Sequence, residues 1–183
     1  MRKIKLGILG GGGDSLIGVL HRVASNMYDR YEITGGVFNP VYEENIKFAE
    51  QIGVKKDRVY VDFDTFITEE IKKSKEERIE VVSVLTPNFL HFPMAKKLLE
   101  NGFHVICEKP LTTTYAEAKE LEALQKVNNA IFAVTYTYTG YPMVRHMKHM
   151  IAEGELGESD VTTAITACCL TDKGNSICDG DGG

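Results

Sequence analysis

The chain has 183 residues, of which 43% are hydrophobic and 26% are charged, and its formal net charge is -5 at pH 7. This composition is typical of a globular protein and argues against a disordered chain, a collagen-like repeat or a coiled-coil rod. The sequence contains no basic block and no apolar run of ~18 residues, so we expect neither a nucleic acid nor a membrane as partner.

Cysteine usage and the amino terminus bear on the cellular compartment. Three of the four cysteines fall after residue 167, without the even spacing of a secreted disulfide framework. Met1-Arg2-Lys3 leads into a glycine-rich stretch and not into the apolar core of a signal peptide. We therefore expect a cytoplasmic protein with reduced thiols.

Strand-like and helix-like segments alternate from residue 4, which is typical of a parallel sheet with crossover helices. The predicted strands are residues 4–9, 31–38, 59–61, 80–85, 104–107 and 131–136. The predicted helices are residues 16–25, 42–52, 64–74, 89–101, 115–127 and 141–153, the fifth with a capping box formed by Thr114 and Glu117.

This alternation predicts an α/β fold with a doubly wound, mostly parallel sheet. We expect residues 1–157 to form this domain. The composition changes after residue 157, and residues 158–183 are predicted to be an irregular or disordered tail with one weak strand between residues 161 and 170.

A glycine-rich turn after the first predicted strand is the first indication of function. A pyrophosphate needs close backbone approach and free N–H groups at a helix N-terminus, and glycines allow both. Gly10 and Gly12 match the first half of G-x-G-x-x-G, but the third position is Ser15 and the next glycine is Gly18, so we expect a longer loop. The alternative is a purely structural turn. The predicted phosphate-binding residues are Gly10, Gly12, Gly13, Asp14, Ser15 and Leu16.

Asn39 ends the second predicted strand, where a carboxylate normally binds the adenosine ribose of NAD. An asparagine can hydrogen-bond a ribose and does not repel a 2'-phosphate, but no Arg or Lys follows at once to attract one. The choice between NAD and NADP therefore stays open, as does the alternative that Asn39-Pro40 only begins a turn.

Two motifs follow the fourth and fifth predicted strands, and here the sequence resembles a known family. Thr86-Pro87-Asn88-Phe89-Leu90-His91 and Glu108-Lys109-Pro110-Leu111, with their spacing, are similar to the motifs of the Gfo/Idh/MocA oxidoreductases. That family is named for glucose/fructose oxidoreductase and inositol dehydrogenase. The likeness covers about residues 3 to 157, including Thr139-Gly140-Tyr141-Pro142 and the turn at residues 153–157.

The resemblance implies a Rossmann domain that binds NAD or NADP, with Lys109 as catalytic residue near the reacting carbon. It also implies that Glu108 lies near the nicotinamide ribose and that the Lys109-Pro110 peptide is cis. Both motifs follow strands at their carboxyl ends, where open α/β sheets bind ligands, and a lysine there can hydrogen-bond the oxygen whose charge changes during hydride transfer. The alternatives are a surface lysine for Lys109 and a helix-capping or packing role for His91. The further predicted cofactor-binding residues are Asn39, Thr86, Pro87, Asn88, His91, Glu108 and Pro110.

Members of the family continue into a second, mostly antiparallel α/β domain that shapes the substrate pocket and supplies an Asp-x-x-x-His pair. The 183-residue sequence contains no Asp-x-x-x-His, so we expect this substrate domain to be missing and the chain to be a truncated or frame-shifted product. A small-molecule substrate is then expected only if a second domain is supplied. Self-association stays open, because an uncovered sheet edge or face favours it.

Three functions remain. The first is an NAD(P)-dependent oxidoreductase acting on a sugar, a polyol or a related small molecule. The second is a cofactor-binding module without turnover, and the third is a subunit completed by another chain. No metal site is predicted, because His146 and His149 share a helix face without a carboxylate or thiol nearby in sequence.

Overall fold

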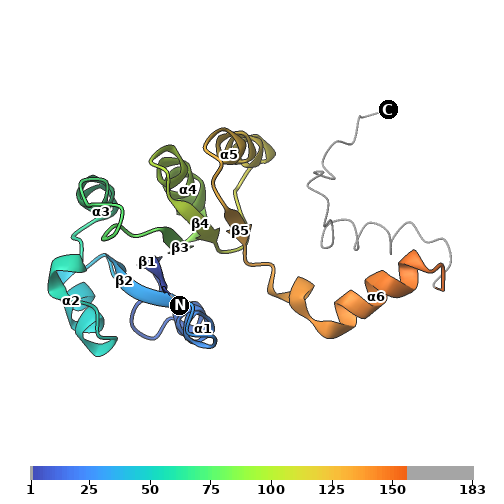
Figure 1. The fold of residues 1–183 in the computed structure, drawn as a ribbon, viewed down its shortest axis with the longest axis horizontal. Helices are drawn as coiled ribbons and strands as arrows, with labels where there is room; N and C mark the ends of the chain where they lie inside the picture. Colours follow the sequence, from blue (N-terminus) through green and yellow to red (C-terminus); the bar gives the residue numbers. More distant parts are fainter. Residues whose placement is uncertain (1, 156–183) are drawn as a thin grey trace. The chain divides into compact units, whose positions relative to one another are not determined.

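The computed structural model describes residues 2–155, in which five parallel strands form one sheet in the order β2-β1-β3-β4-β5 (Figure 1). The strands are β1 (Ile4–Gly10), β2 (Tyr31–Val37), β3 (Val81–Leu85), β4 (His104–Cys107) and β5 (Phe132–Val134). The helices are α1 (Leu16–Asn26), α2 (Tyr42–Gln51), α3 (Phe63–Glu70), α4 (His91–Glu100), α5 (Tyr115–Val127) and α6 (Pro142–Ala152), with short 3-10 helices η1 (Lys56–Arg58), η2 (Asn88–Leu90) and η3 (Thr137–Gly140). The predicted α/β fold with a parallel sheet is confirmed.

Two compact units are distinguished, one up to Thr135 and one from Tyr136 onward. The second unit contains η3 and α6. Helix α6 begins at Pro142, and a proline suits this first position because the N–H that it lacks would have no partner inside the helix. The predicted tail at residues 158–183 and its weak strand lie outside the described residues. Within residues 2–155, no helix combines the length and the apolar character that a membrane span needs.

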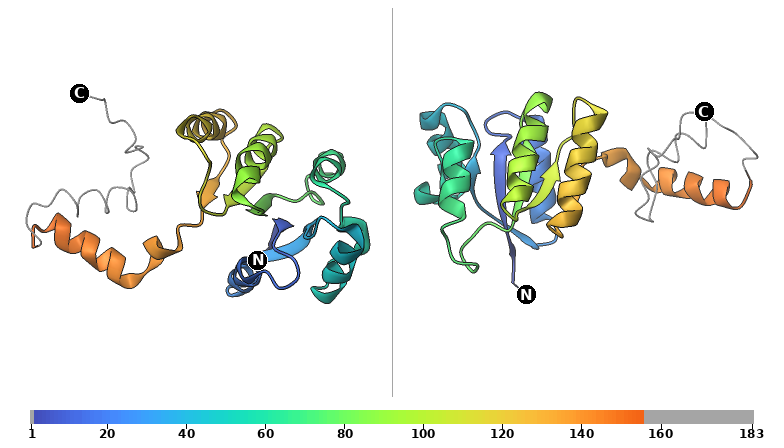
Figure 2. Two further views of the ribbon diagram at one scale, coloured as in Figure 1. Left: turned by 180° about the vertical axis from the view of Figure 1, so that it is seen from behind. Right: turned by 90° about the horizontal axis from the view of Figure 1, so that it is seen from above.

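The sheet is covered on both faces, α1 and α2 lying on one side and α3, α4 and α5 on the other (Figures 1 and 2). Alternate residues of β1 enter different cores, because successive side chains of a strand point to opposite faces. Leu6 and Ile8 pack in one buried cluster with Phe48 of α2, and Leu9 packs in the other with Leu98 of α4. This double burial explains why the central strand β3 is almost entirely apolar.

Local signals place most helix ends correctly. The Thr114 hydroxyl accepts a hydrogen bond from the Glu117 N–H at 3.3 Å, and the Glu117 carboxylate accepts one from the Thr114 N–H at 3.0 Å. The predicted capping box is therefore confirmed. Helix α3 ends at Glu70 and not at residue 74, and the predicted helix at 89–101 divides into η2 and α4.

The strand predicted at residues 59–61 is wrong, because only a single bridge pairs Val59 with Gly36 at the outer edge of β2. Side-chain hydrogen bonds replace the ladder there. The buried Asn45 amide accepts from the Phe38 N–H at 2.8 Å and donates to the Tyr60 carbonyl at 2.8 Å. The Phe38 N–H and the Tyr60 carbonyl would otherwise be available to pair with each other and extend the ladder. Because both bond to Asn45, the pairing ends after the bridge between Gly36 and Val59.

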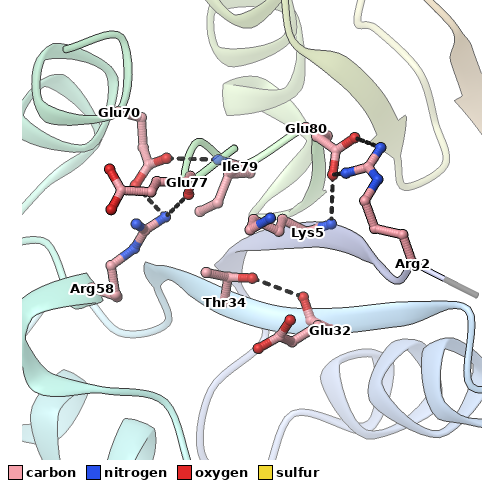
Figure 3. Close-up of polar contacts among 9 residues, drawn as sticks. All are labelled: Arg2, Lys5, Glu32, Thr34, Arg58, Glu70, Glu77, Ile79 and Glu80. Carbon is pink, nitrogen blue, oxygen red and sulfur yellow. Dashed lines mark hydrogen bonds and ion pairs between the residues drawn. The ribbon is translucent and has the colours of Figure 1, made fainter. Parts of the chain in front are cut away.

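A buried ionic network holds the end of α3 to the segment before β3 (Figure 3). Glu70 is fully buried, and its carboxylate contacts Arg58 at 2.8 Å and accepts from the Ile79 N–H at 2.8 Å. The Tyr60 hydroxyl donates to the same carboxylate. Burial, together with the neighbouring Glu70, raises the pKa of Tyr60, so this hydroxyl keeps the proton that it donates.

We predict that Asn45→Ala destabilises the protein by about 2 kcal/mol or more, because it leaves a buried N–H and a buried carbonyl without partners. Urea unfolding followed by circular dichroism measures the change. Asn128→Ala serves as the control, since the Asn128 side chain donates to the Leu124 carbonyl on the exposed surface. Equal stability of the two variants would contradict the role assigned to Asn45.

Candidate functional site

The turn after β1 has the backbone conformation that only glycines adopt easily. Gly10, Gly11 and Gly13 have φ angles of 81°, 67° and 55°. The amides of Gly13 and Asp14 donate no hydrogen bond within residues 2–155, and a Cβ at Gly13 would meet nothing within 4 Å. The turn therefore offers free N–H groups on an open side, as an anion requires.

Other predicted residues of this turn stabilise the turn itself. The Gly12 N–H donates to the Phe38 carbonyl at 3.1 Å, so this amide is used by the fold. The Ser15 hydroxyl caps α1 by accepting from the Gly18 N–H at 3.2 Å. Leu16, at the start of α1, is 70% exposed and belongs to the first helical turn, whose N–H groups point toward the loop.

Gly18 is a site residue that the sequence prediction left out of its set. A Cβ on Gly18 would lie 1.8 Å from the Gly11 carbonyl oxygen and 2.8 Å from the Gly11 Cα. Gly18 thus takes the role of the third glycine of the fingerprint, which allows the helix to pack closely on the turn. The sequence contained a sign of this role, because Gly18 is the next glycine after Ser15, which occupies the third position of G-x-G-x-x-G.

Arg22 was also missed. Its Nη1 donates to the Gly11 carbonyl at 2.7 Å, and its guanidinium lies 4.8 Å from the centre of the Phe48 ring. Burial lowers the pKa of Arg22, although such a group stays charged at neutral pH. Arg22 therefore fixes the glycine turn from one side and adds positive charge next to it.

Asn39 follows β2 and is partly exposed. Its Oδ1 accepts from the Val41 N–H at 2.9 Å, which forms the turn that we considered as an alternative. Its side-chain NH₂ group makes no hydrogen bond within the described residues, so it is able to donate to a ribose hydroxyl as well. The two interpretations of Asn39 are therefore compatible.

The predicted residues in and after the loop that follows β3 differ in their exposure. Pro87 and Asn88 are exposed, and Thr86 is partly buried. His91 is only 1% exposed, and its ring nitrogens lie 2.7 Å from the Pro110 carbonyl and 2.9 Å from the Thr86 carbonyl. Both ring nitrogens are thus engaged by the protein. The burial of His91 therefore favours the packing role, in which it joins two loops, and its contact with a cofactor stays a prediction.

The loop after β4 contains Glu108, Lys109 and Pro110, and the Lys109-Pro110 peptide is cis as expected. Glu108 is 9% exposed, and its Oε1 lies 3.0 Å from His21 Nε2 and accepts from the Thr135 hydroxyl. Its Oε2 accepts from the Lys109 N–H at 3.2 Å. Burial alone would raise the pKa of Glu108, but the hydrogen bonds from Thr135 and His21 outweigh it and lower this pKa.

Lys109 is exposed, and its ammonium forms no hydrogen bond or ion pair within residues 2–155. Its backbone is nevertheless held on both sides, by the contacts of Glu108 and of Pro110. An unpaired ammonium on a fixed backbone is available to a ligand oxygen.

A series of contacts joins the three motifs. A Cβ on Gly10 would lie 3.1 Å from the Thr86 amide nitrogen, so the glycine turn adjoins the loop after β3. His91 connects that loop to Pro110, and His21 connects Glu108 back to α1. The candidate residues therefore meet at the carboxyl edge of the sheet, although His21 and Thr135 were not among those predicted.

The amino-terminal edge carries a different feature, a hollow of about 830 Å³. Its two arginines are engaged by the protein itself. Arg2 donates twice to Glu80 at 2.8 Å (Figure 3), and Arg78 lies 4.1 Å from the centre of the Phe103 ring. The glycine turn and the motifs after β3 and β4 lie at the carboxyl ends of their strands, away from this hollow. Within residues 2–155, no group of three or more His, Cys, Asp or Glu side chains is arranged to bind a metal ion.

Comparison with known proteins agrees with this geometry. Residues 4–136 match the family model GFO_IDH_MocA, described as an oxidoreductase family with an NAD-binding Rossmann fold. The chain belongs to the Gfo/Idh/MocA oxidoreductase family. It is 36% identical over 179 residues to the uncharacterized oxidoreductase YfiI of Bacillus subtilis, covering 96% of this chain and 45% of YfiI.

Two further relatives carry more specific names. The structure of an inositol dehydrogenase homolog from Azotobacter vinelandii, complexed with NADH and myo-inositol, matches with a TM-score of 0.82 and 38% identity, over 86% of this chain and 41% of that one. Levoglucosan dehydrogenase of Pseudarthrobacter phenanthrenivorans is 40% identical over 79 residues, which are 43% of this chain and 20% of that protein. The chain thus spans less than half the length of these Gfo/Idh/MocA relatives.

We predict that Gly18→Ala destabilises this Gfo/Idh/MocA domain by about 2 kcal/mol or more, because the added methyl group would overlap the Gly11 carbonyl and push α1 from the turn. Chemical denaturation measures the loss. Gly140→Ala is the matched control, since a Cβ at Gly140 would meet nothing within 4 Å. An unchanged midpoint for Gly18→Ala would mean that the helix does not pack on the turn in this way.

A second prediction concerns pH. The pKa of Glu108 is lowered in the folded protein, so its charge contributes stability above the unfolded pKa of about 4.3, and this contribution is lost as the pH falls through the folded pKa. Glu108→Gln lacks this titration. We therefore expect the difference in unfolding free energy between wild type and Glu108→Gln to shrink from roughly pH 5 to pH 3. A difference that stays constant or grows over this range would refute the assigned pairing.

Proposed function

We propose that this chain is the dinucleotide-binding part of an NAD(P)-dependent oxidoreductase that acts on a sugar, a polyol or a related small molecule. The observation that carries the proposal is the meeting of two complementary groups at one edge of the sheet. Free amides on the glycine turn suit an anion, and the unpaired ammonium of Lys109 suits a reacting oxygen.

The residues present fit a dinucleotide. The Gly13 and Asp14 amides and the first turn of α1 would bind the pyrophosphate. The free NH₂ group of Asn39 would donate to the adenosine ribose, and Glu108 would accept from a hydroxyl of the nicotinamide ribose. Oε2 is the more available oxygen of Glu108, because within residues 2–155 it accepts a hydrogen bond only from the adjacent amide of Lys109.

We propose NAD as the preferred cofactor over NADP. A 2'-phosphate would lie near Asn39 and the start of α2, because this is where the adenosine ribose is bound in Rossmann domains. The first turn of α2 contains Glu43 and Glu44, and no Arg or Lys follows Asn39 at once. Two carboxylates near a phosphate are repulsive, whereas the neutral diol of NAD has no such cost.

The chemistry proposed for the site is hydride transfer, for which the bound nicotinamide supplies the acceptor carbon. Lys109 would donate a hydrogen bond to the substrate oxygen and stabilise the negative charge that this oxygen carries once its proton has passed to water. Thr135 and His21 hold the Glu108 carboxylate, which accepts a hydrogen bond from the Lys109 N–H. Glu108 would thereby fix the backbone of Lys109 so that its ammonium reaches the substrate oxygen. The names of the inositol dehydrogenase homolog and of levoglucosan dehydrogenase support a substrate rich in hydroxyl groups.

A second candidate function is a module that binds the cofactor without turnover. One observation favours it, namely that the groups assigned to the site bind the cofactor or hold Glu108, and only Lys109 is assigned to the reacting oxygen. The two candidates share the cofactor site and differ only in whether an alcohol is oxidised.

The test is a titration of the purified chain with NADH and NADPH, followed by nicotinamide fluorescence. We expect NADH to bind with a roughly micromolar or weaker dissociation constant and NADPH to bind about tenfold more weakly, and ADP-ribose to displace NADH. A dehydrogenase screen with NAD and a panel of polyols and sugars then separates the two candidates, since only the enzyme produces NADH. Absence of NADH binding at millimolar concentration would refute both.

A further inference from the structure

Adjacent residues of α1 contact the two loops that would bind opposite ends of the cofactor. Arg22 donates to the carbonyl of Gly11 in the glycine turn at 2.7 Å. His21 lies 3.0 Å from the carboxylate of Glu108 in the loop after β4. One helix thus holds the spacing between the turn for the pyrophosphate and the segment that carries Lys109.

The two oxygens of the Glu108 carboxylate have different hydrogen-bond partners. Its Oε1 is engaged by His21 from α1 and by the Thr135 hydroxyl that follows β5. Its Oε2 receives only the adjacent Lys109 N–H, at 3.2 Å. The side chains of His21 and Glu108 are 14% and 12% exposed, so their contact is well shielded from water. Such shielding strengthens a charge-assisted hydrogen bond.

The backbone of Thr135 fixes the position of its hydroxyl. The Thr135 N–H donates to the Cys107 carbonyl at 3.0 Å, and the single hydroxyl hydrogen is then directed to Glu108 Oε1. Thr135 is therefore tied to the end of β4, immediately before Glu108. At the other end of the segment, His91 holds the Pro110 carbonyl at 2.7 Å. Lys109 stands between two fixed neighbours.

We propose that His21, together with Thr135, is a positioning residue that orients the Glu108 carboxylate so that Oε2 accepts a hydrogen bond from the nicotinamide ribose. The inference rests on the function proposed above. His21 acts through Glu108 and touches neither the cofactor nor the substrate. Its loss would weaken the binding of the nicotinamide half while leaving the pyrophosphate and adenosine half unaffected.

The experiment compares NADH with ADP-ribose, which lacks the nicotinamide. For His21→Phe, which keeps a ring but removes the hydrogen bond, we expect NADH to bind about tenfold more weakly and ADP-ribose to bind within about twofold of wild type. Thr135→Val removes the second hydrogen bond with little change of shape and should give the same pattern. It also tests the inference independently if His21→Phe does not fold.

Two controls separate positioning from a general loss of structure. Thr135→Ser keeps the hydroxyl and should restore NADH binding to within about threefold of wild type. His146→Phe changes an exposed histidine of α6 and should leave both affinities unchanged. The emission maximum of bound NADH, which reports the surroundings of the nicotinamide, should shift in His21→Phe and not in His146→Phe.

The outcomes are distinguishable. If wild type binds neither ligand, the proposed function fails and this inference fails with it. If wild type binds both, and His21→Phe and Thr135→Val bind NADH as tightly as wild type, only the positioning role is overturned. Equal weakening of NADH and ADP-ribose would also overturn it, because His21 would then support the glycine turn and not Glu108.

Discussion

The close contact between α1 and the turn after β1 is the constraint on which the rest of the site depends. A Cβ on Gly18 would lie 1.8 Å from the Gly11 carbonyl oxygen, so no side chain fits between the helix and the turn. Backbone packs directly on backbone there. This approach brings the start of α1 to the turn with free amides, and it determines which loops His21 and Arg22 reach from the same helix.

The site is stabilised by many modest contacts that form a closed series. Gly10 adjoins Thr86, His91 connects Thr86 to Pro110, and Glu108 returns to α1 through His21. Each hydrogen bond contributes on the order of 1 kcal/mol, but the loss of one leaves a buried partner unsatisfied. The series therefore fixes the backbone of Lys109 while leaving the ammonium of that residue exposed.

The two edges of the sheet use charge in different ways. At the amino-terminal edge, Arg2 is paired with Glu80, and the buried Glu70 is paired with Arg58. At the carboxyl edge, the amides of Gly13 and Asp14 and the ammonium of Lys109 lack partners within the described residues. All strands are parallel and each crossover helix starts at the carboxyl edge, so helix N-termini and loops gather there. We therefore expect a ligand to bind at the carboxyl edge, where N–H groups and an ammonium are free to donate hydrogen bonds.

Local patterns in the sequence determined most of the elements. Strand β4 lies at residues 104–107 as predicted, and the capping box of Thr114 and Glu117 is present, because both depend on residues close together in the chain. The motif around Lys109 indicated the family for a similar reason. Its residues are contiguous in the chain, so it is recognised without knowing which residues surround it in space. The glycine turn was located, although its spacing hid the role of Gly18.

Tertiary structure decided what depends on residues distant in sequence. His21 and Glu108 are 87 positions apart, and no periodicity or motif links them. The burial of His91 follows from the approach of two loops, and the strand at residues 59–61 was reduced to one bridge by the side chain of Asn45 from a neighbouring helix. Hydrogen-bond partners are chosen by distance in space, and only the packing of the sheet and its helices sets that distance.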